Sequence, residues 1–364
     1  MRLPPKTAAE VQLRCDDLAP SLAFFTDLGF RIESISPADA PSAASLSGHG
    51  LRLRLAPGDG DPGIIRIPSV EPGRTVTAPN GTRVVFVEAE PAVVLPPFRP
   101  EFVLTRGGEA GEGRAGMLYR DLIPGRLGGR YIASHITIPE GGPVADWVHY
   151  HRVALQLIYV RHGWVRVVYE DQGQPFVMNA GDLVVQPPEI RHRVLESSDG
   201  LEVIEVSCPA LHETFADHEM ILPNRRPTLW NRMARSPRFG EQRFLHRVPP
   251  QSSWFTTGDR WEVQSFKLVD AKVFFATACR LRKLPPQDAY PAHNGELFFR
   301  FVLSGSATLE FDGKHELVAG DSFVIPPDHP WALSDASPDL ELFAVNVDDP
   351  TRFMMTPAAS PHAG

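Results

Sequence analysis

The chain has 364 residues, of which 43% are hydrophobic and 22% charged, a composition typical of a folded protein with two or three domains. Its net charge is −8, with no offsetting block of Lys and Arg, which argues against a nucleic-acid partner. The sequence has no run of about 18 apolar residues and no apolar signal core, so we expect no membrane segment. Three scattered cysteines favour a reducing, cytoplasmic setting.

The first part of the chain, residues 8–105, is predicted to form a small α+β unit. The 36 prolines and 29 glycines of the chain favour short strands joined by turns. Residues 10–15 alternate as a strand does, and residues 18–28 carry apolar side chains at helical spacing. Further strands of this unit are expected at residues 30–36, 51–55 and 82–88.

The rest of the chain contains an internal repeat. After a polar linker at residues 106–116, GDLVVQPP at residues 181–188 matches GDSFVIPP at residues 320–327. Nearly every segment around both copies reads as a short strand. A repeat of roughly 100 residues built from strands predicts two copies of one β-barrel domain. We place them at residues 117–223 and 243–349, with a basic, proline-containing linker at residues 224–242 between them.

Four side chains of the first copy suit a metal ion. His149 and His151 project from the same face of a strand, because side chains two apart share a face. Gln156 would fall on the other face of that strand, so the chain must turn before it. His192 follows a turn at Pro187 that would return a later strand to the barrel mouth. Imidazoles suit transition metals, and a neutral amide oxygen would complete a site without ligand charge.

These residues resemble the two motifs of the cupin family. The first motif is His-x-His, then Glu after three or four residues and Gly after six more, and His149, His151, Gln156 and Gly163 fit it with Gln in place of Glu. The second motif is Gly, five residues, Pro, x, Gly, two residues and His; Gly181, Pro187 and His192 fit it, with Glu189 where Gly is usual.

The resemblance implies a mainly β fold of two tandem cupin barrels, each a double-stranded β-helix or jelly roll, preceded by a small α+β βαβββ unit. It also implies one divalent transition metal per chain, Fe, Mn, Ni or Zn, bound by His149, His151, Gln156 and His192. A Gln at this position is known among family members with non-redox chemistry, such as ring opening of unsaturated uronates and hydroxynitrile cleavage.

The second copy lacks these ligands. Its side chains at the corresponding four positions are Pro291, His293, Phe298 and Trp331. An improvised site from His293, Glu296 and His329 is an alternative, but we expect a packed, metal-free barrel that supports the fold. In the first copy, we expect His135, Tyr159 and Arg193 to reach the substrate pocket. The segment LHETFADHE at residues 211–219 mimics a helical metal site, and we expect it to be solvated.

The segment VQLRCDDLAPSLAFFTDLGF at residues 11–30 resembles the first strand and helix of the vicinal-oxygen-chelate superfamily, which includes glyoxalase and bleomycin-resistance proteins. In that superfamily Glu10 would stand at the position of the first metal-binding His, and Glu88 near the last carboxylate. One βαβββ unit cannot complete a four-ligand site and would leave an apolar face exposed. We therefore expect this unit to mediate interaction, as in a homodimer.

Three functions follow as expectations. The first is a dioxygenase-type oxidoreductase that takes a small organic substrate and dioxygen, as the resemblance to aromatic-ring and enediol bicupin dioxygenases implies. The second is a non-redox isomerase, ring-opening enzyme or lyase, which Gln156 favours. The third is a non-catalytic ligand-binding or sensing protein.

Overall fold

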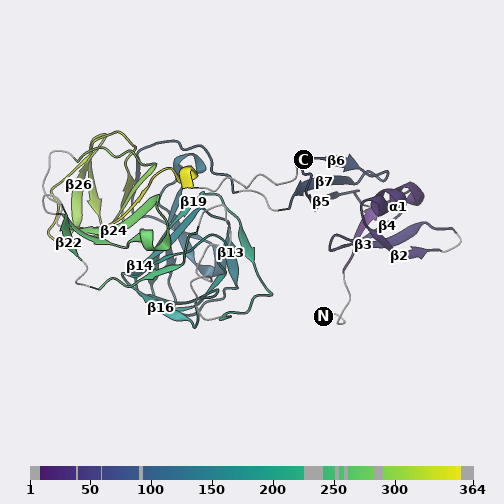
Figure 1. Cartoon of the computed structure of the whole chain (residues 1–364), viewed down its shortest axis with the longest axis horizontal. Coiled ribbons are helices and arrows are strands. Elements are labelled where there is room, and N and C mark those ends of the chain that lie inside the picture. The colour runs from purple at the N-terminus through teal and green to yellow at the C-terminus, as the bar shows by residue number, and fades with distance from the viewer. Residues whose placement is uncertain are drawn as a thin grey trace, which may run out of the picture. The chain divides into compact units, whose positions relative to one another are not determined.

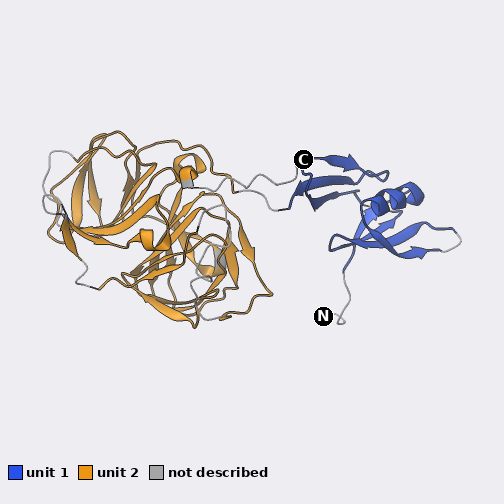
Figure 2. Cartoon of the chain, in the orientation of Figure 1, with its two compact units in different colours: residues 1–92 blue, residues 93–364 orange. Residues whose placement is uncertain are grey.

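The fold is mainly β, as predicted. The computed structural model describes residues 9–37, 40–58, 60–89, 93–224, 241–250, 254–257, 261–282 and 290–353. The chain divides into two compact units, residues 1–92 and residues 93–364 (Figure 2). The first unit therefore ends before residue 105, where the sequence placed its boundary, and the reason lies in the strand pairing of the second unit.

The first unit begins with a βαβββ arrangement, with its sheet in the order β1-β4-β3-β2 and β1 parallel to β4. Its elements are β1 (Val11–Arg14), α1 (Leu18–Asp27), β2 (Arg31–Ser36), β3 (Ala43–Gly48) and β4 (Leu51–Ala56). Helix α1 buries Leu18 and Phe25, and Gly29, with φ of +91°, leads the chain out of the helix end as few other residues could.

A second, smaller sheet completes this unit, in the order β5-β7-β6. Its strands are β5 (Ile64–Ser69), β6 (Thr75–Thr77) and β7 (Arg83–Glu88). The strand expected at residues 82–88 therefore belongs to this second sheet and not to the first. The set of three strands after the helix in the first sheet is completed by β3, which was not predicted because its AASLSG sequence has few large apolar residues. Leu53 of the first sheet and Val84 of the second share one core. The apolar face that we expected to be exposed is therefore packed within the chain.

The first barrel of the second unit consists of two facing sheets, in the orders β21-β17-β14-β19-β11-β10-β9 and β16-β15-β18-β13-β20, with β12 beside β18. Its strands in chain order are β9 (Gly111–Glu112), β10 (Leu118–Asp121), β11 (Ile132–Ile138), β12 (Gly142–Pro143), β13 (His149–His151), β14 (Leu155–His162), β15 (Trp164–Tyr169), β16 (Phe176–Asn179), β17 (Leu183–Val185), β18 (His192–Ser197), β19 (Leu201–Cys208) and β20 (Thr214–Ala216).

The second barrel repeats this plan, with sheets in the orders β22-β23-β24-β30-β25-β28-β8 and β27-β26-β29. Its strands are β22 (Phe255–Thr257), β23 (Trp261–Ser265), β24 (Ala276–Arg282), β25 (Leu297–Ser304), β26 (Ser306–Glu310), β27 (Lys314–Val318), β28 (Ser322–Val324), β29 (Ala332–Ser334) and β30 (Glu341–Val347). The equivalent sheet orders agree with the internal repeat of the sequence.

Each barrel has one edge strand that comes from the segment preceding the other barrel in the chain. Strand β8 (Val103–Thr105), which precedes the first barrel in the chain, pairs with β28 of the second barrel. Strand β21 (Leu245–Arg247), which precedes the second barrel, pairs with β17 of the first. Each exchanged strand covers a sheet edge that would otherwise expose unpaired backbone groups. Domain boundaries based on the repeat alone therefore divide these strands wrongly. Residues 225–240 of the predicted linker lie outside the described residues.

A continuous apolar core joins the two barrels, which Figure 1 shows side by side. The ring of Tyr159 on β14 stacks on that of Phe343 on β30, with centroids 4.5 Å apart and planes 13° apart. Both faces of the large sheet of the first barrel are therefore buried, one against its own interior and one against the second barrel.

An ion-pair network also crosses this interface. Nε and Nη2 of Arg130 donate to the two carboxylate oxygens of Glu296 at 2.8 and 2.9 Å, and Nη2 also reaches Asp349 at 3.2 Å. The hydroxyl of Tyr131 donates to Glu296 at 2.6 Å. Arg130 is only 5% exposed, so Glu296 neutralises a buried charge of the first barrel.

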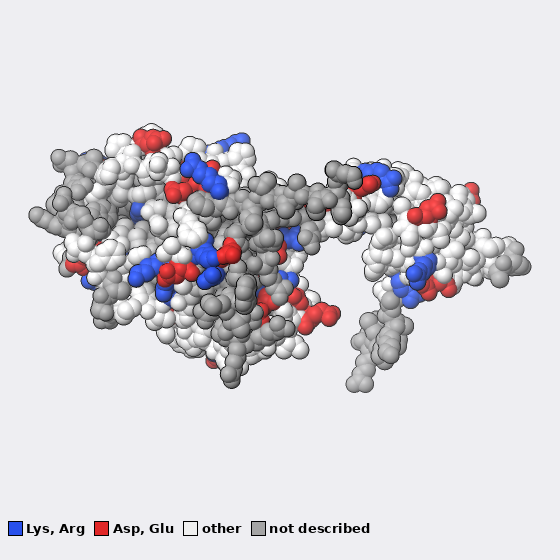
Figure 3. Space-filling model, in the orientation of Figure 1, with Lys and Arg blue, Asp and Glu red and all other residues white. Residues whose placement is uncertain are grey.

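Charged groups are spread over the surface. On the face shown in Figure 3, basic and acidic side chains of the described residues are interspersed and form no continuous basic band. Within the described part of the chain, none of the helices has the length and apolar character needed to cross a membrane.

Candidate metal centre

The structure brings three predicted ligands together. His149 on β13 pairs in register with His192 on β18, and His151 lies two residues along β13. Each ring offers one nitrogen, and these nitrogens all lie within 4.8 Å of one another. His149 is fully buried, and 6% of His192 is exposed. Three convergent imidazoles inside a barrel are a donor set suited to one transition-metal ion.

Backbone carbonyls fix the orientation of two of these rings. Nδ1 of His149 donates to the carbonyl oxygen of Trp147 at 2.8 Å, and Nδ1 of His192 to that of Ile190 at 3.0 Å. Because a carbonyl can only accept, the proton of each neutral ring is on Nδ1. The lone pair is therefore on Nε2, which is the form that ligates a metal.

The third ring is oriented by a hydroxyl group. Nδ1 of His151 and Oγ1 of Thr214 are 2.9 Å apart, and Thr214 belongs to β20, which pairs with β13. When Nε2 of His151 serves as a ligand, Nδ1 carries the proton and donates it to Thr214. Such an outer contact holds the ring in one orientation and raises its basicity.

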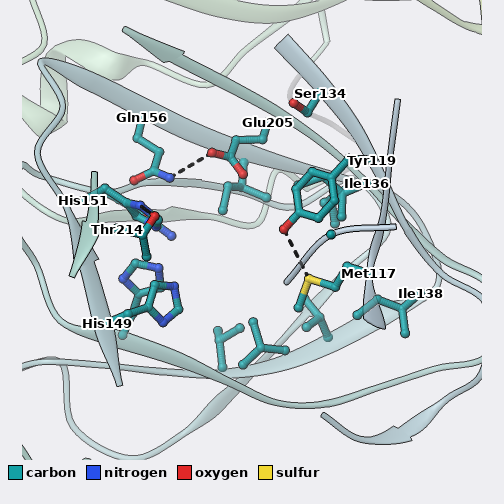
Figure 4. A pocket seen from close by; sticks show the side chains of 18 of the residues that line it. Met117, Tyr119, Ser134, Ile136, Ile138, His149, His151, Gln156, Glu205 and Thr214 are labelled. Atoms are coloured by element: carbon teal, nitrogen blue, oxygen red, sulfur yellow. Dashed lines mark hydrogen bonds between the residues drawn. The ribbon is translucent and has the colours of Figure 1, made fainter. Parts of the chain in front are cut away.

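Gln156 approaches the same place from the opposite sheet, on β14. The chain turns between β13 and β14, as we expected from strand parity. Nε2 of Gln156 donates to Oε1 of Glu205 at 2.9 Å. A carboxylate can only accept, so this contact identifies the nitrogen of the amide and turns its oxygen the other way, toward His151 (Figure 4). Gln156 therefore presents a neutral oxygen donor beside the three rings.

Glu205, on β19, was not predicted from the sequence. Its Oε1 accepts from Gln156 and also from the hydroxyl of Ser207 at 3.1 Å. A signal was available, because Leu201, Val203 and Glu205 share one face of the strand LEVIEVSC and all line the cavity. A lone carboxylate on an otherwise apolar face is a candidate for function.

These side chains lie at one end of a cavity of about 420 Å³ inside the first barrel (Figure 4). Its other walls are largely apolar, as with Ile136, Ile158, Val165, Val203 and Met178. Of the described residues that line it, Glu205 is the one that belongs to the charged types Asp, Glu, Lys and Arg. This is the pattern of a binding site for a small organic molecule, with a few polar groups to orient it.

The segment after β19 also contributes to the cavity, contrary to our expectation that it is solvated. Thr214 belongs to β20, and both His212 and Thr214 line the cavity. The ring of His212 lies perpendicular to that of His151, with centroids 5.5 Å apart. The signal in the sequence was strand spacing, since residues two apart share a face, and not the helical spacing that we considered.

None of the three side chains predicted to reach the pocket lines this cavity. His135 faces away from it and donates from Nε2 to Glu202 at 2.8 Å. Tyr159 is stacked in the core between the barrels, where burial raises its pKa to about 12. Arg193 lies between His192 and Val194, which do line the cavity, so strand alternation turns it outward.

The second barrel fills the corresponding space with rings. His293 stacks on Phe298, with centroids 4.6 Å apart, and Phe298 meets the edge of Trp331 at 5.2 Å. Nε2 of His293 donates to the carbonyl of Ile325 at 2.9 Å. Pro291 offers no metal-binding side-chain atom. The structure thus agrees with a packed barrel at these positions.

The improvised site of the second barrel is not formed. Glu296 pairs with Arg130 instead, and Nδ1 of His329 donates to the carbonyl of Pro327 at 2.7 Å. Among the described residues, the one group of three or more His, Cys, Asp or Glu side chains close enough to share a metal ion is that of the first barrel.

No curated protein sequence matches the chain. Similar solved structures include protein Ylba from E. coli, at 12% identity and a TM-score of 0.47 over 68% of this chain and 91% of that one. Oxalate decarboxylase from Bacillus subtilis is 15% identical, with a TM-score of 0.45 over 71% of this chain and 78% of that one.

The family model described as the cupin domain matches two segments of the chain, residues 134–207 and residues 280–346. The first segment contains His149, His151, Gln156 and His192, and the second contains the aromatic replacements. Both segments consist of the strands that form the facing sheets of the two barrels. Each barrel therefore contains one segment that matches the cupin domain model.

Proposed function

We propose that this protein is a metal-dependent cupin enzyme with one divalent transition metal per chain. His149, His151 and His192 would hold the ion, with the amide oxygen of Gln156 as the fourth ligand. The observation that carries the proposal is the convergence of three ring nitrogens within 4.8 Å at the cavity of the first barrel. The donor set of imidazole nitrogens and one amide oxygen suits Fe, Mn, Ni or Zn.

The substrate that fits this cavity is a small organic molecule with an apolar body and one or two oxygen atoms. The apolar walls would bury the body of the substrate, while the polar end faces its oxygen atoms. A bound ion would act as a Lewis acid that binds and polarises those oxygen atoms. Thr214 and the two backbone carbonyls would keep the imidazoles in their ligating orientation.

For the reaction, we propose dioxygenase-type oxidation of such a substrate. The largely apolar walls support this proposal, because they keep bulk water away from the reacting atoms and can admit dioxygen, which is small and apolar. A non-redox reaction, such as isomerisation or lyase chemistry, is the second candidate. The specific observation that favours it is Gln156, a neutral ligand whose amide is hydrogen-bonded to the carboxylate of Glu205.

The experiment is elemental analysis of the purified protein, followed by oxygen uptake with catechol, enediol and diketone substrates. We expect one metal ion per chain and oxygen uptake with one of these classes. His151→Ala should remove the metal, whereas His293→Ala, the matched change in the second barrel, should retain it. A stoichiometric metal without oxygen uptake would favour the non-redox candidate. A wild-type protein that binds no transition metal would refute the proposal.

A further inference from the structure

The carboxylate of Glu205 is held in a way that leaves half of it for a ligand. Oε1 accepts two hydrogen bonds, from Gln156 at 2.9 Å and from Ser207 at 3.1 Å. The other oxygen, Oε2, is turned toward the cavity (Figure 4). The carboxylate is therefore anchored on one side and offers a hydrogen-bond acceptor on the other.

The charges around the cavity make this acceptor selective. Among the described residues that line it, none is Lys or Arg, so none of them offers a cation to an anionic substituent. The three imidazoles and the amide are neutral as ligands. A carboxylate group placed beside Oε2 would face a like charge in apolar surroundings, where repulsion is strong. A hydroxyl or N–H group at the same place would form a charge-assisted hydrogen bond.

We infer that Glu205 determines specificity, and that the substrate is an uncharged molecule with an apolar body, an oxygen atom for the metal and a neighbouring hydroxyl or N–H group for Glu205. This inference rests on the proposed function, because it assumes that the metal binds the substrate in this cavity. It narrows the substrate class to neutral phenols, enols and similar compounds and excludes those that would place an anionic group beside Glu205.

The contacts of Glu205 predict what an isosteric change does. In Glu205→Gln, the donors from Gln156 and Ser207 continue to require an acceptor, so the new amide oxygen takes the place of Oε1. The amide nitrogen then takes the place of Oε2 and faces the cavity. The substitution therefore removes the negative charge and also replaces an acceptor by a donor, with almost no change in shape.

The test compares catechol with phthalate in the metal-loaded full chain. Both are small aromatic rings with two adjacent oxygen-bearing groups, and in phthalate both groups are carboxylates at neutral pH, so one of them faces Glu205 in either orientation. Calorimetry gives the dissociation constant (Kd) of each. We expect the ratio of the Kd of phthalate to that of catechol to fall about 10-fold to 100-fold in Glu205→Gln, the range that a hydrogen bond to a charged group is worth.

Glu196→Gln is the matched control, because it removes a carboxylate of the same barrel that forms an exposed ion pair with Arg166; its ratio should equal that of the wild type. If Glu205→Gln does not fold, Glu205→Leu tests the loss of charge in these apolar surroundings. An unchanged ratio in the folded Glu205 variant would overturn the inference and leave the proposed function intact. Metal-loaded wild type that binds neither compound would overturn the inference alone, whereas wild type that takes up no metal would overturn the proposed function as well.

Discussion

Replacement of Glu296 by Ala should destabilise the two barrels without affecting the metal. Glu296 belongs to the second barrel and accepts two hydrogen bonds from Arg130 and one from Tyr131, both of the first barrel. Its removal leaves the guanidinium of Arg130, which is 5% exposed, without its principal counter-charge. Metal content should stay the same, since Glu296 lies in the barrel whose rings fill the corresponding site.

The size of the effect follows from these contacts. Removing one partner of a buried ion pair costs about 3–5 kcal/mol. Asp349 remains 3.2 Å from Arg130 and compensates part of the charge. We therefore expect the lower end of this range, about 3 kcal/mol, which is more than 100-fold in the unfolding equilibrium. Tyr131 also loses its hydrogen-bond acceptor, so the loss in free energy of unfolding should not be smaller than about 3 kcal/mol.

Urea unfolding followed by tryptophan fluorescence measures this change. All six tryptophans lie after residue 92, so their fluorescence reports on the barrels alone. Glu196→Ala is the control, because its partner Arg166 is 45% exposed and such pairs contribute up to about 1 kcal/mol. A cost for Glu296→Ala no larger than that of the control would refute the argument for a buried pair. Loss of metal from Glu296→Ala would instead indicate that the second barrel binds a metal ion.

Three further changes test other parts of the structure. Phe343→Ala should cost about 3–5 kcal/mol in urea unfolding, and a folded variant should retain its metal in elemental analysis. Hydrogen bonding from His135 lowers the pKa of Glu202 from 4.5 to about 2. The contribution of Glu202 to stability is therefore complete above pH 4.5 and is lost as the pH falls toward 2. Glu202→Gln should flatten the pH dependence of the unfolding midpoint between these two pH values. Thr214→Val, which removes the partner of His151, should weaken metal binding about 10-fold to 100-fold in competition with a chelator.

The fold and the meeting of the three histidines could be predicted because they depend on local patterns. Strand alternation places His149 and His151 on one face, and the repeated Gly-Asp turn followed by Pro brings His192 back beside them. The presence of two β-barrels follows from the repeat, and the jelly-roll class from the resemblance to the two cupin motifs. The edge strands β8 and β21 could not be assigned, because each pairs with the more distant barrel. The sequence of a three-residue strand does not indicate which strand it pairs with.

The faces of β11 and β14 that line the pocket could not be predicted, because both faces of the large sheet are apolar. Along β14, Leu157 and Tyr159 pack against the second barrel, while Gln156 and Ile158 line the cavity. Alternation identifies two faces of a strand, but it tells which face is inside only when the other is polar. Tyr159 and His135 were therefore assigned to the cavity although both belong to the face between the barrels.

This burial on two sides gives the second barrel a role that needs no ligand. Gln156 and Glu205 stand on β14 and β19, adjacent central strands of the sheet that the second barrel covers. A polar group acts as a selective acceptor only if its own position is fixed. A sheet packed on both faces holds these two side chains with little freedom to adjust. The rings of Phe298 and Trp331 pack in the interior of the second barrel, so this barrel gives the sheet a rigid support. A barrel with rings in place of metal ligands can therefore support the sheet that carries Gln156 and Glu205.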